Sequence, residues 1–128
     1  MLSYLARIFI MPTMALVSIF HNPQCSKSNQ ALALLEENGI ELTIINYMKN
    51  PPSAHQIKEL ALKLGVSVRQ MTREHEPEYR GQRLDEASDT ELAEAIEKTP
   101  KLMQRPIVVK GDNALIGRPP EIVLEILG

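Results

Sequence analysis

The sequence of 128 residues predicts an α/β domain in which a mixed sheet carries helices on both faces. Three observations lead to this fold class. An apolar segment, a helical segment and a β-branched segment follow one another over residues 15–47, as in two parallel strands joined by a crossover helix. Two apolar segments flank Gly111-Asp112, which is a two-residue signal for an antiparallel hairpin. A polar and partly helical stretch separates the two halves.

The first predicted strand covers residues 15–20 and leads into a helix over residues 26–37. The strand is short and apolar, as expected for a buried strand of a parallel pair. Ser26 or Ser28 lies where an N-cap is expected, and Gly39 ends the helix. The apolar stripe of this helix consists of Ala31, Leu32, Leu34 and Leu35.

A second strand is predicted over residues 41–47, where β-branched residues are frequent. The stretch "NPPS" forms a turn, and Ser53 then caps a helix that ends at Gly65. Residues 66–87 are polar and poorly periodic, and we expect only short helical turns in "SVRQMTRE" and "EPEYRG". The glutamates of this stretch are interpreted as a solvated face; they are Glu74, Glu76 and Glu78.

A clear helix is predicted over residues 88–100, because Ser88 and Glu91 match a capping box. The hairpin follows, and "PPEIVLEIL" closes the chain as a helix with proline in its first turn. The resulting order is β-α-β, a helical insertion, and β-β-α. A parallel half joined to an antiparallel hairpin and helix in one mixed sheet is typical of the thioredoxin-like fold.

Residues 14–128 are predicted to form this single domain, and residues 1–13 are predicted to be an N-terminal extension. Arg7 and Pro12 interrupt the apolar N-terminal run, and no A-x-A cleavage site follows it, which argues against a secretion signal or a membrane helix. A net charge of -2 with dispersed basic residues argues against nucleic-acid and membrane-surface binding. One cysteine excludes an internal disulfide and a multi-cysteine zinc site, and predicts a reducing, cytoplasmic location without a metal.

Cys25 is the candidate catalytic residue, since it lies between a strand end and a helix start. A helix N-terminus offers unpaired N–H groups and a partial positive charge, which favour the reactive thiolate. Ser26 and Ser28 add hydroxyl donors at the same place. The alternative is a small buried cysteine without chemistry. His21 is either a base or electrostatic partner of the thiolate, or a turn histidine bonded to the loop backbone.

Ser28 occupies the place where dithiol oxidoreductases of this architecture carry the second cysteine of C-x-x-C. No other cysteine exists in the chain. Redox chemistry at Cys25 therefore needs an outside thiol, either a small thiol such as glutathione or a partner protein. No bound cofactor is expected, and glutathione would act as a co-substrate.

Two arginines are expected to meet at the open end of the hairpin. If Gly111 and Asp112 form the turn, Arg105 lies opposite Arg118 on one face of the sheet. Like charges placed in this way either stay apart in water or hold an anion between them, and guanidinium groups suit a tetrahedral oxyanion. Pro106 lies where thioredoxin-like folds usually have a cis proline, so we expect a cis Arg105–Pro106 bond.

The stretches "FHNPQCSKS", "NPPS", "SVRQMTRE", "LMQRPIVV" and "LIGRPPEIVLEIL" resemble the glutaredoxin-coupled arsenate reductases, the ArsC family, in order and spacing over residues 15–127. The resemblance is closest to the single-cysteine, arsenate-reductase-like members. It implies that Cys25 attacks arsenate while Arg73, Arg105 and Arg118 hold the oxyanion. Arg69 competes with Arg73 for its role.

The resemblance further implies that glutathione completes the reduction to arsenite and that glutaredoxin resolves the mixed disulfide. One departure is Asn29, where many relatives carry an arginine that would strengthen the positive field. Two other functions stay open at this point. One is a monothiol, glutathione-linked oxidoreductase that does not act on arsenate. The other is a thioredoxin-like regulator that binds RNA polymerase, although those proteins usually carry C-x-x-C, and this chain has Ser28.

Overall fold

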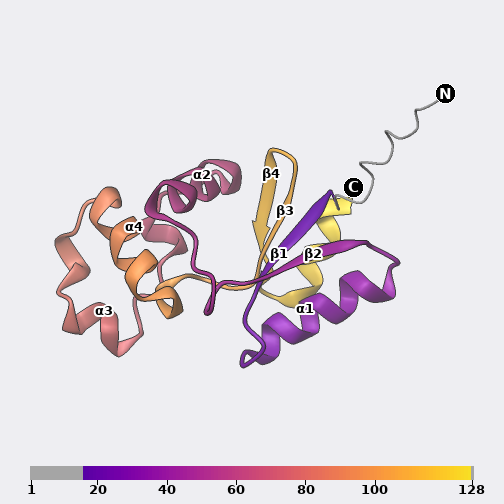
Figure 1. The fold of residues 1–128 in the computed structure, drawn as a ribbon, viewed down its shortest axis with the longest axis horizontal. Helices are drawn as coiled ribbons and strands as arrows, with labels where there is room; N and C mark the ends of the chain where they lie inside the picture. Colours follow the sequence, from indigo (N-terminus) through magenta and orange to yellow (C-terminus); the bar gives the residue numbers. More distant parts are fainter. Residues whose placement is uncertain (1–15, 128) are drawn as a thin grey trace.

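A computed structural model describes residues 16–127, and the predicted extension 1–13 lies outside the described residues. The sheet has four strands in the order β2-β1-β3-β4 (Figure 1). In chain order, the elements are β1 (Val17–His21), α1 (Ser26–Glu37), β2 (Leu42–Asn46), α2 (Ala54–Leu64), η2 (Arg69–Met71), α3 (Pro77–Gly81), η3 (Leu84–Glu86), α4 (Asp89–Lys98), η4 (Pro100–Leu102), β3 (Ile107–Lys110), β4 (Asn113–Ile116) and η5 (Pro120–Leu127). Here η denotes a 3-10 helix.

The sheet is mixed, as the sequence predicts. Strand β1 pairs in parallel with β2 and antiparallel with β3, and β3 forms a hairpin with β4. The predicted hairpin register is confirmed, since Ile107 lies opposite Ile116. Gly111 adopts a positive φ of 61° in the turn, a conformation that favours glycine.

Hydrophobic cores lie on both faces of the sheet, because residues along β1 alternate between them. Ile19 packs with α1 and η5 on one face, whereas Phe20 packs against the core formed with α2 and α4 on the other. Figure 1 shows α1 and the yellow C-terminal segment on one side, with α2, α3 and α4 on the opposite side. The predicted covering of both faces is thus confirmed.

The capping residues set the helix boundaries close to those predicted. Ser53 and Ser88 each cap a helix, and both form a complete capping box, with Gln56 and Glu91 respectively. Helix α1 differs, because its N-cap residue is Cys25 itself and Ser26 is already helical. The reactive-residue candidate therefore occupies the cap position.

The C-terminal segment is helical as predicted, but it is a 3-10 helix rather than an α-helix. Its buried residues are Pro120, Val123 and Ile126, which are spaced by three. Because a 3-10 helix has three residues per turn, this spacing puts all of them on the face toward the sheet.

Residues 66–87, the region that sequence patterns describe least well, are ordered by tertiary contacts. The side chain of Arg69 donates to the hydroxyl of Tyr79 and to the carbonyls of Leu84 and Ala87. Arg69 therefore links the short helices of this region to one another. Within residues 16–127, no helix is long and apolar enough to span a membrane.

Candidate active site

Cys25 follows β1 through a short loop that is held by its own asparagines. The backbone N–H of Cys25 donates to the carbonyl of Asn22 at 2.9 Å, and the Asn22 side chain accepts from the N–H of Gln24 at 2.9 Å. Asn29 reaches back from α1, and its side-chain nitrogen donates to the Pro23 carbonyl at 3.0 Å. Asn29, the departure from many relatives, thus helps to fix the loop in this chain.

The site lowers the pKa of the Cys25 thiol below its ordinary value. Burial by itself would raise this pKa. The backbone N–H of Ser28, the guanidinium of Arg105 and the backbone N–H of Lys27 favour the thiolate and outweigh burial. The helix N-terminus therefore acts on the sulfur through the N–H groups of Ser28 and Lys27, and Arg105 adds to this effect.

Ser28 and His21 form a buried pair beneath the cysteine loop. The Ser28 hydroxyl lies 2.6 Å from Nδ1 of His21 and accepts the backbone N–H of Asn22 at 3.0 Å. The side chains are fully buried for Ser28 and only 6% exposed for His21, and burial lowers the pKa of His21 although Glu36 opposes the shift. The Ser28 hydroxyl is thus engaged with His21, and Ser26 is exposed; hydroxyl donation to a substrate stays a prediction for both.

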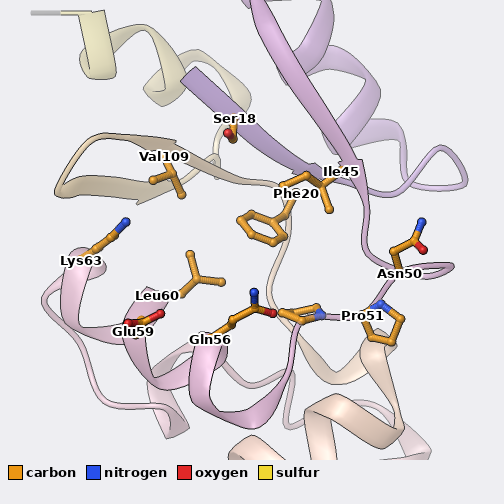
Figure 2. Close-up of a pocket in the computed structure, with 11 residues that line it drawn as sticks. Ser18, Phe20, Ile45, Asn50, Pro51, Gln56, Glu59, Leu60, Lys63 and Val109 are labelled. Carbon is orange, nitrogen blue, oxygen red and sulfur yellow. The ribbon is translucent and has the colours of Figure 1, made fainter. Parts of the chain in front are cut away.

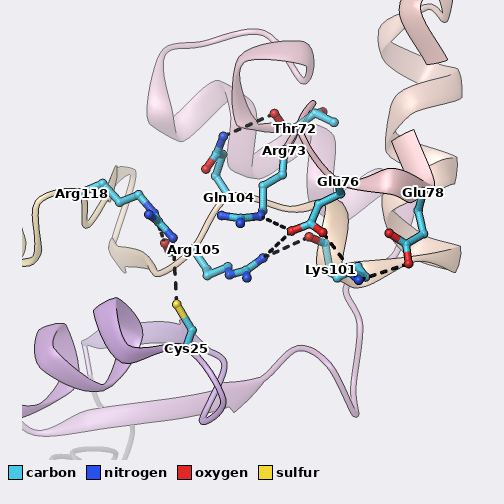
Figure 3. A network of polar contacts seen from close by, with 9 residues as sticks. All are labelled: Cys25, Thr72, Arg73, Glu76, Glu78, Lys101, Gln104, Arg105 and Arg118. Atoms are coloured by element: carbon cyan, nitrogen blue, oxygen red, sulfur yellow. Dashed lines mark hydrogen bonds and ion pairs between the residues drawn. The ribbon is translucent and has the colours of Figure 1, made fainter. Parts of the chain in front are cut away.

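Arg118 reaches the thiol from the open end of the hairpin, after β4 (Figure 3). Its Nη2 lies 4.0 Å from Sγ of Cys25, and its Nε donates to the carbonyl of Arg105 at 2.9 Å. The neighbouring Gly117 has no room for a side chain, since a Cβ there would lie 2.7 Å from Val123. This close approach of the hairpin end to η5 positions Arg118 beside Cys25.

Arg105 is the most buried arginine of the site, with a side chain only 14% exposed. Its Nη1 donates to the carbonyl of Lys101 at 3.1 Å, while its buried Nε has no hydrogen-bond partner within residues 16–127. The Arg105–Pro106 bond is cis, as expected, and so is Arg118–Pro119. Since an unpaired buried donor is costly, the Nε is suited to an anionic ligand beside the thiol.

Arg73 joins the site through an isolated antiparallel bridge between Thr72 and Met103. The backbone N–H of Arg73 donates to the carbonyl of Leu102 at 2.6 Å, next to the segment that leads to Arg105. Arg69, the competitor from sequence, is instead engaged with α3 and the residues after it. The structure therefore brings Cys25 together with Arg105 and Arg118, and it places Arg73 next to Arg105 through their shared partner Glu76.

Glu76 lies among these cations, and the interpretation of Glu76 as part of a solvated face is wrong. Its carboxylate lies 3.0 Å from Arg73 Nε, 3.6 Å from Lys101 Nζ and 4.0 Å from Arg105 Nη1. The side chain is only 15% exposed, because the bridge at Thr72 folds this segment over Lys101. Burial alone would raise its pKa, but Arg73, followed by Lys101 and Arg105, lowers it. No local pattern in the sequence distinguishes Glu76 from its exposed neighbours.

Two hollows near the sheet differ in their distance from the cysteine loop. One has a volume of about 420 Å³ and borders the cysteine loop, with Gln24, Lys49 and Arg105 among its lining residues. The other, of about 350 Å³, lies between the sheet and α2, with Phe20, Leu60 and Lys63 in its walls (Figure 2). Among the described residues, no group of three or more His, Cys, Asp or Glu side chains is placed to hold a metal ion.

Comparison with known proteins places this geometry in a family, since the model of the ArsC family matches residues 20–126. The chain belongs to the ArsC family. An ArsC relative from Haemophilus influenzae named arsenate reductase is 48% identical over 87% of this chain and 98% of its own length. The Escherichia coli protein YfgD, named uncharacterized, is 46% identical over 88% of this chain and 97% of its own.

Solved structures of ArsC-like proteins agree with the fold. A structure described as an arsenate reductase from Vibrio cholerae superposes with a TM-score of 0.83 and is 47% identical, covering 86% of this chain and 96% of the other. The resemblance to the ArsC family and the thioredoxin-like α/β fold predicted from sequence are both confirmed.

Proposed function

We propose that this protein reduces arsenate to arsenite, with Cys25 as the nucleophile and with glutathione and glutaredoxin as external thiols. Relatives that are 48% and 40% identical are named arsenate reductase, which supports the substrate. The observation that carries the proposal is the unpaired, buried Nε of Arg105 beside a thiol with a lowered pKa. Arg118, at 4.0 Å from the sulfur, adds a second guanidinium.

In the proposed first step, the Cys25 thiolate attacks arsenic and forms an As–S bond. One As–O bond breaks, and the oxygen leaves as water after protonation. Guanidinium groups offset the repulsion between the thiolate and the arsenate anion and orient arsenic toward the sulfur. In this proposal, Arg105 and Arg118 act on the anion directly, while Arg73 adds positive charge behind Arg105; the contacts of Arg118 with Cys25 and of Arg73 and Arg105 with Glu76 support this arrangement.

In the second step, a glutathione thiolate attacks the sulfur of Cys25. The new S–S bond replaces the As–S bond, whose electron pair stays on arsenic and converts As(V) to As(III). The two sulfurs together lose two electrons, and arsenite leaves. Glutaredoxin then removes the glutathionyl group by thiol–disulfide exchange and returns the Cys25 thiolate. These external thiols, like the lone cysteine, are consistent with the cytoplasm as the place of action.

The test is arsenate-dependent NADPH oxidation by the purified protein with glutathione, glutaredoxin and glutathione reductase. We expect turnover with the wild type and none with Cys25→Ser, while circular dichroism shows the same fold for both. Arsenate reduction by Cys25→Ser would overturn the mechanism.

Two further assays address the alternatives. Activity on a glutathionylated peptide without activity on arsenate would support the monothiol oxidoreductase. Stoichiometric binding to purified RNA polymerase without either activity would support the regulator.

A further inference from the structure

The hollow beside the cysteine loop is positioned to supply the second reactant of the proposed reaction. It lies where the parallel strands β1 and β2 both end, lined by residues 22–24 and by the turn that begins at Asn46. Ligands of open α/β sheets bind in the crevice outside the carboxyl ends of strands. Its volume of about 420 Å³ is within the range of about 300–1,000 Å³ that is usual for small-ligand sites.

Cys25 does not line the hollow, but two of the lining residues adjoin it. Gln24, in its wall, directly precedes Cys25, and Arg105, in another wall, acts on the thiol. Figure 3 shows Arg105 between Cys25 and Lys101, which also lines the hollow. A thiol bound in the hollow therefore lies close to the sulfur that it must attack.

The charge of the hollow favours an anionic ligand. Among its described lining residues, Lys49, Lys101 and Arg105 are cationic and none is acidic. Lys101 is partly neutralised by Glu78 at 3.2 Å and Glu76 at 3.6 Å. Lys49, in contrast, is exposed and forms no ion pair within the described part of the chain. An incoming carboxylate can thus pair with Lys49 without displacing another partner.

The remaining lining residues suit a short peptide. The side-chain amides of Gln24 and Asn46 offer hydrogen bonds to peptide groups, and the partly exposed Met48 offers apolar contact to methylene groups. The hollow between the sheet and α2 differs in charge, because Glu59 lines it together with Lys63. Its residues also come from other parts of the chain than the cysteine loop.

We propose that the hollow formed by residues 22–24, the turn after β2 and Lys101 is the binding site for the second thiol, an anionic thiol tripeptide such as glutathione, with Lys49 pairing one of its carboxylates. This inference rests on the proposed function, which requires an outside thiol. Glutathione carries two carboxylates and one ammonium group, so its net charge is negative at neutral pH.

The site can be tested without arsenate by the reaction of Cys25 with oxidised glutathione. The Cys25 thiolate attacks one sulfur of the disulfide, forms a mixed disulfide and releases one glutathione thiolate, so no further oxidant is needed. The neutral 2-hydroxyethyl disulfide reports the intrinsic reactivity of the thiol at the same pH. The ratio of the two rate constants therefore measures recognition of the glutathionyl group.

We expect Lys49→Ala to lower this ratio by about two- to fivefold, as for loss of an exposed ion pair, and Lys49→Glu to lower it further. The matched control is Lys63→Ala, which removes a lysine from the other hollow and should leave the ratio unchanged. In arsenate turnover, Lys49→Ala should raise KM for glutathione and leave KM for arsenate unaltered.

The outcomes separate the site from the proposed function. Equal ratios for the wild type and Lys49→Ala, or a similar fall in Lys63→Ala, would overturn the site even if arsenate is reduced. A ratio that depends on Lys49 in a protein that does not reduce arsenate would support the site and overturn the proposed function.

Discussion

Replacement of Ser28 by alanine should loosen the loop that carries Cys25. The Ser28 hydroxyl is fully buried and pairs with His21 Nδ1 at 2.6 Å and with the Asn22 N–H at 3.0 Å. Alanine leaves both partners buried without a hydrogen bond, and each such group costs about 1–3 kcal/mol. We therefore expect a loss of about 2–6 kcal/mol in the free energy of unfolding.

Urea denaturation followed by circular dichroism measures this loss. With a slope of about 2 kcal/mol/M, which is ordinary for a small domain, the midpoint should fall by about 1–3 M. Ser26→Ala is the matched control, because Ser26 lies in the same helical turn but is exposed, and the change should stay within about 0.5 kcal/mol. Equal midpoints for the two variants would refute the assigned role of the Ser28 hydroxyl.

Three further predictions concern charges near the thiol. Burial lowers the pKa of His21 from its ordinary value of 6.5, so the unfolded state binds more protons than the folded state in acid. The stability of the wild type should therefore fall as the pH drops below 6.5. His21→Gln should show a smaller fall in urea midpoint between about pH 7 and pH 5. Glu76→Gln should destabilise the protein by about 1–3 kcal/mol at pH 7. Because the folded state lowers the pKa of Glu76 from its ordinary value of 4.5, this difference should shrink as the pH falls below 4.5. A difference that stays constant in acid would contradict the ion-pair role. Arg118→Ala should weaken protection of Cys25 from iodoacetamide by phosphate at least twofold, whereas Arg83→Ala should not; unchanged protection in Arg118→Ala would argue against a guanidinium clamp.

Local chemistry explains the parts of the fold that were predicted well. A capping serine pairs with a residue three positions away, as Ser53 and Ser88 do, so the helix starts could be predicted from adjacent residues. Likewise, Gly111-Asp112 sets the register of the hairpin because the turn leaves one way to pair the strands. The type of the C-terminal helix was less predictable. Its buried residues, Pro120, Val123 and Ile126, are spaced by three, and this spacing selects a 3-10 helix only when the segment packs against the sheet.

Long-range contacts decided most of the candidate site. The sequence by itself placed Cys25 at a helix N-terminus and predicted Arg105 opposite Arg118 at the open end of the hairpin, because both inferences use neighbouring residues and the turn. Arg73 reaches the site through the bridge between Thr72 and Met103, which are far apart in sequence. Chain folding likewise decides three other features of the site: the position of the Glu76 carboxylate among three cations, the pairing of Ser28 with His21, and the hollow at Lys49. Short-range periodicity predicts which residues face the core or cap a helix. The partner of a buried charge, in contrast, is determined only when distant segments pack together.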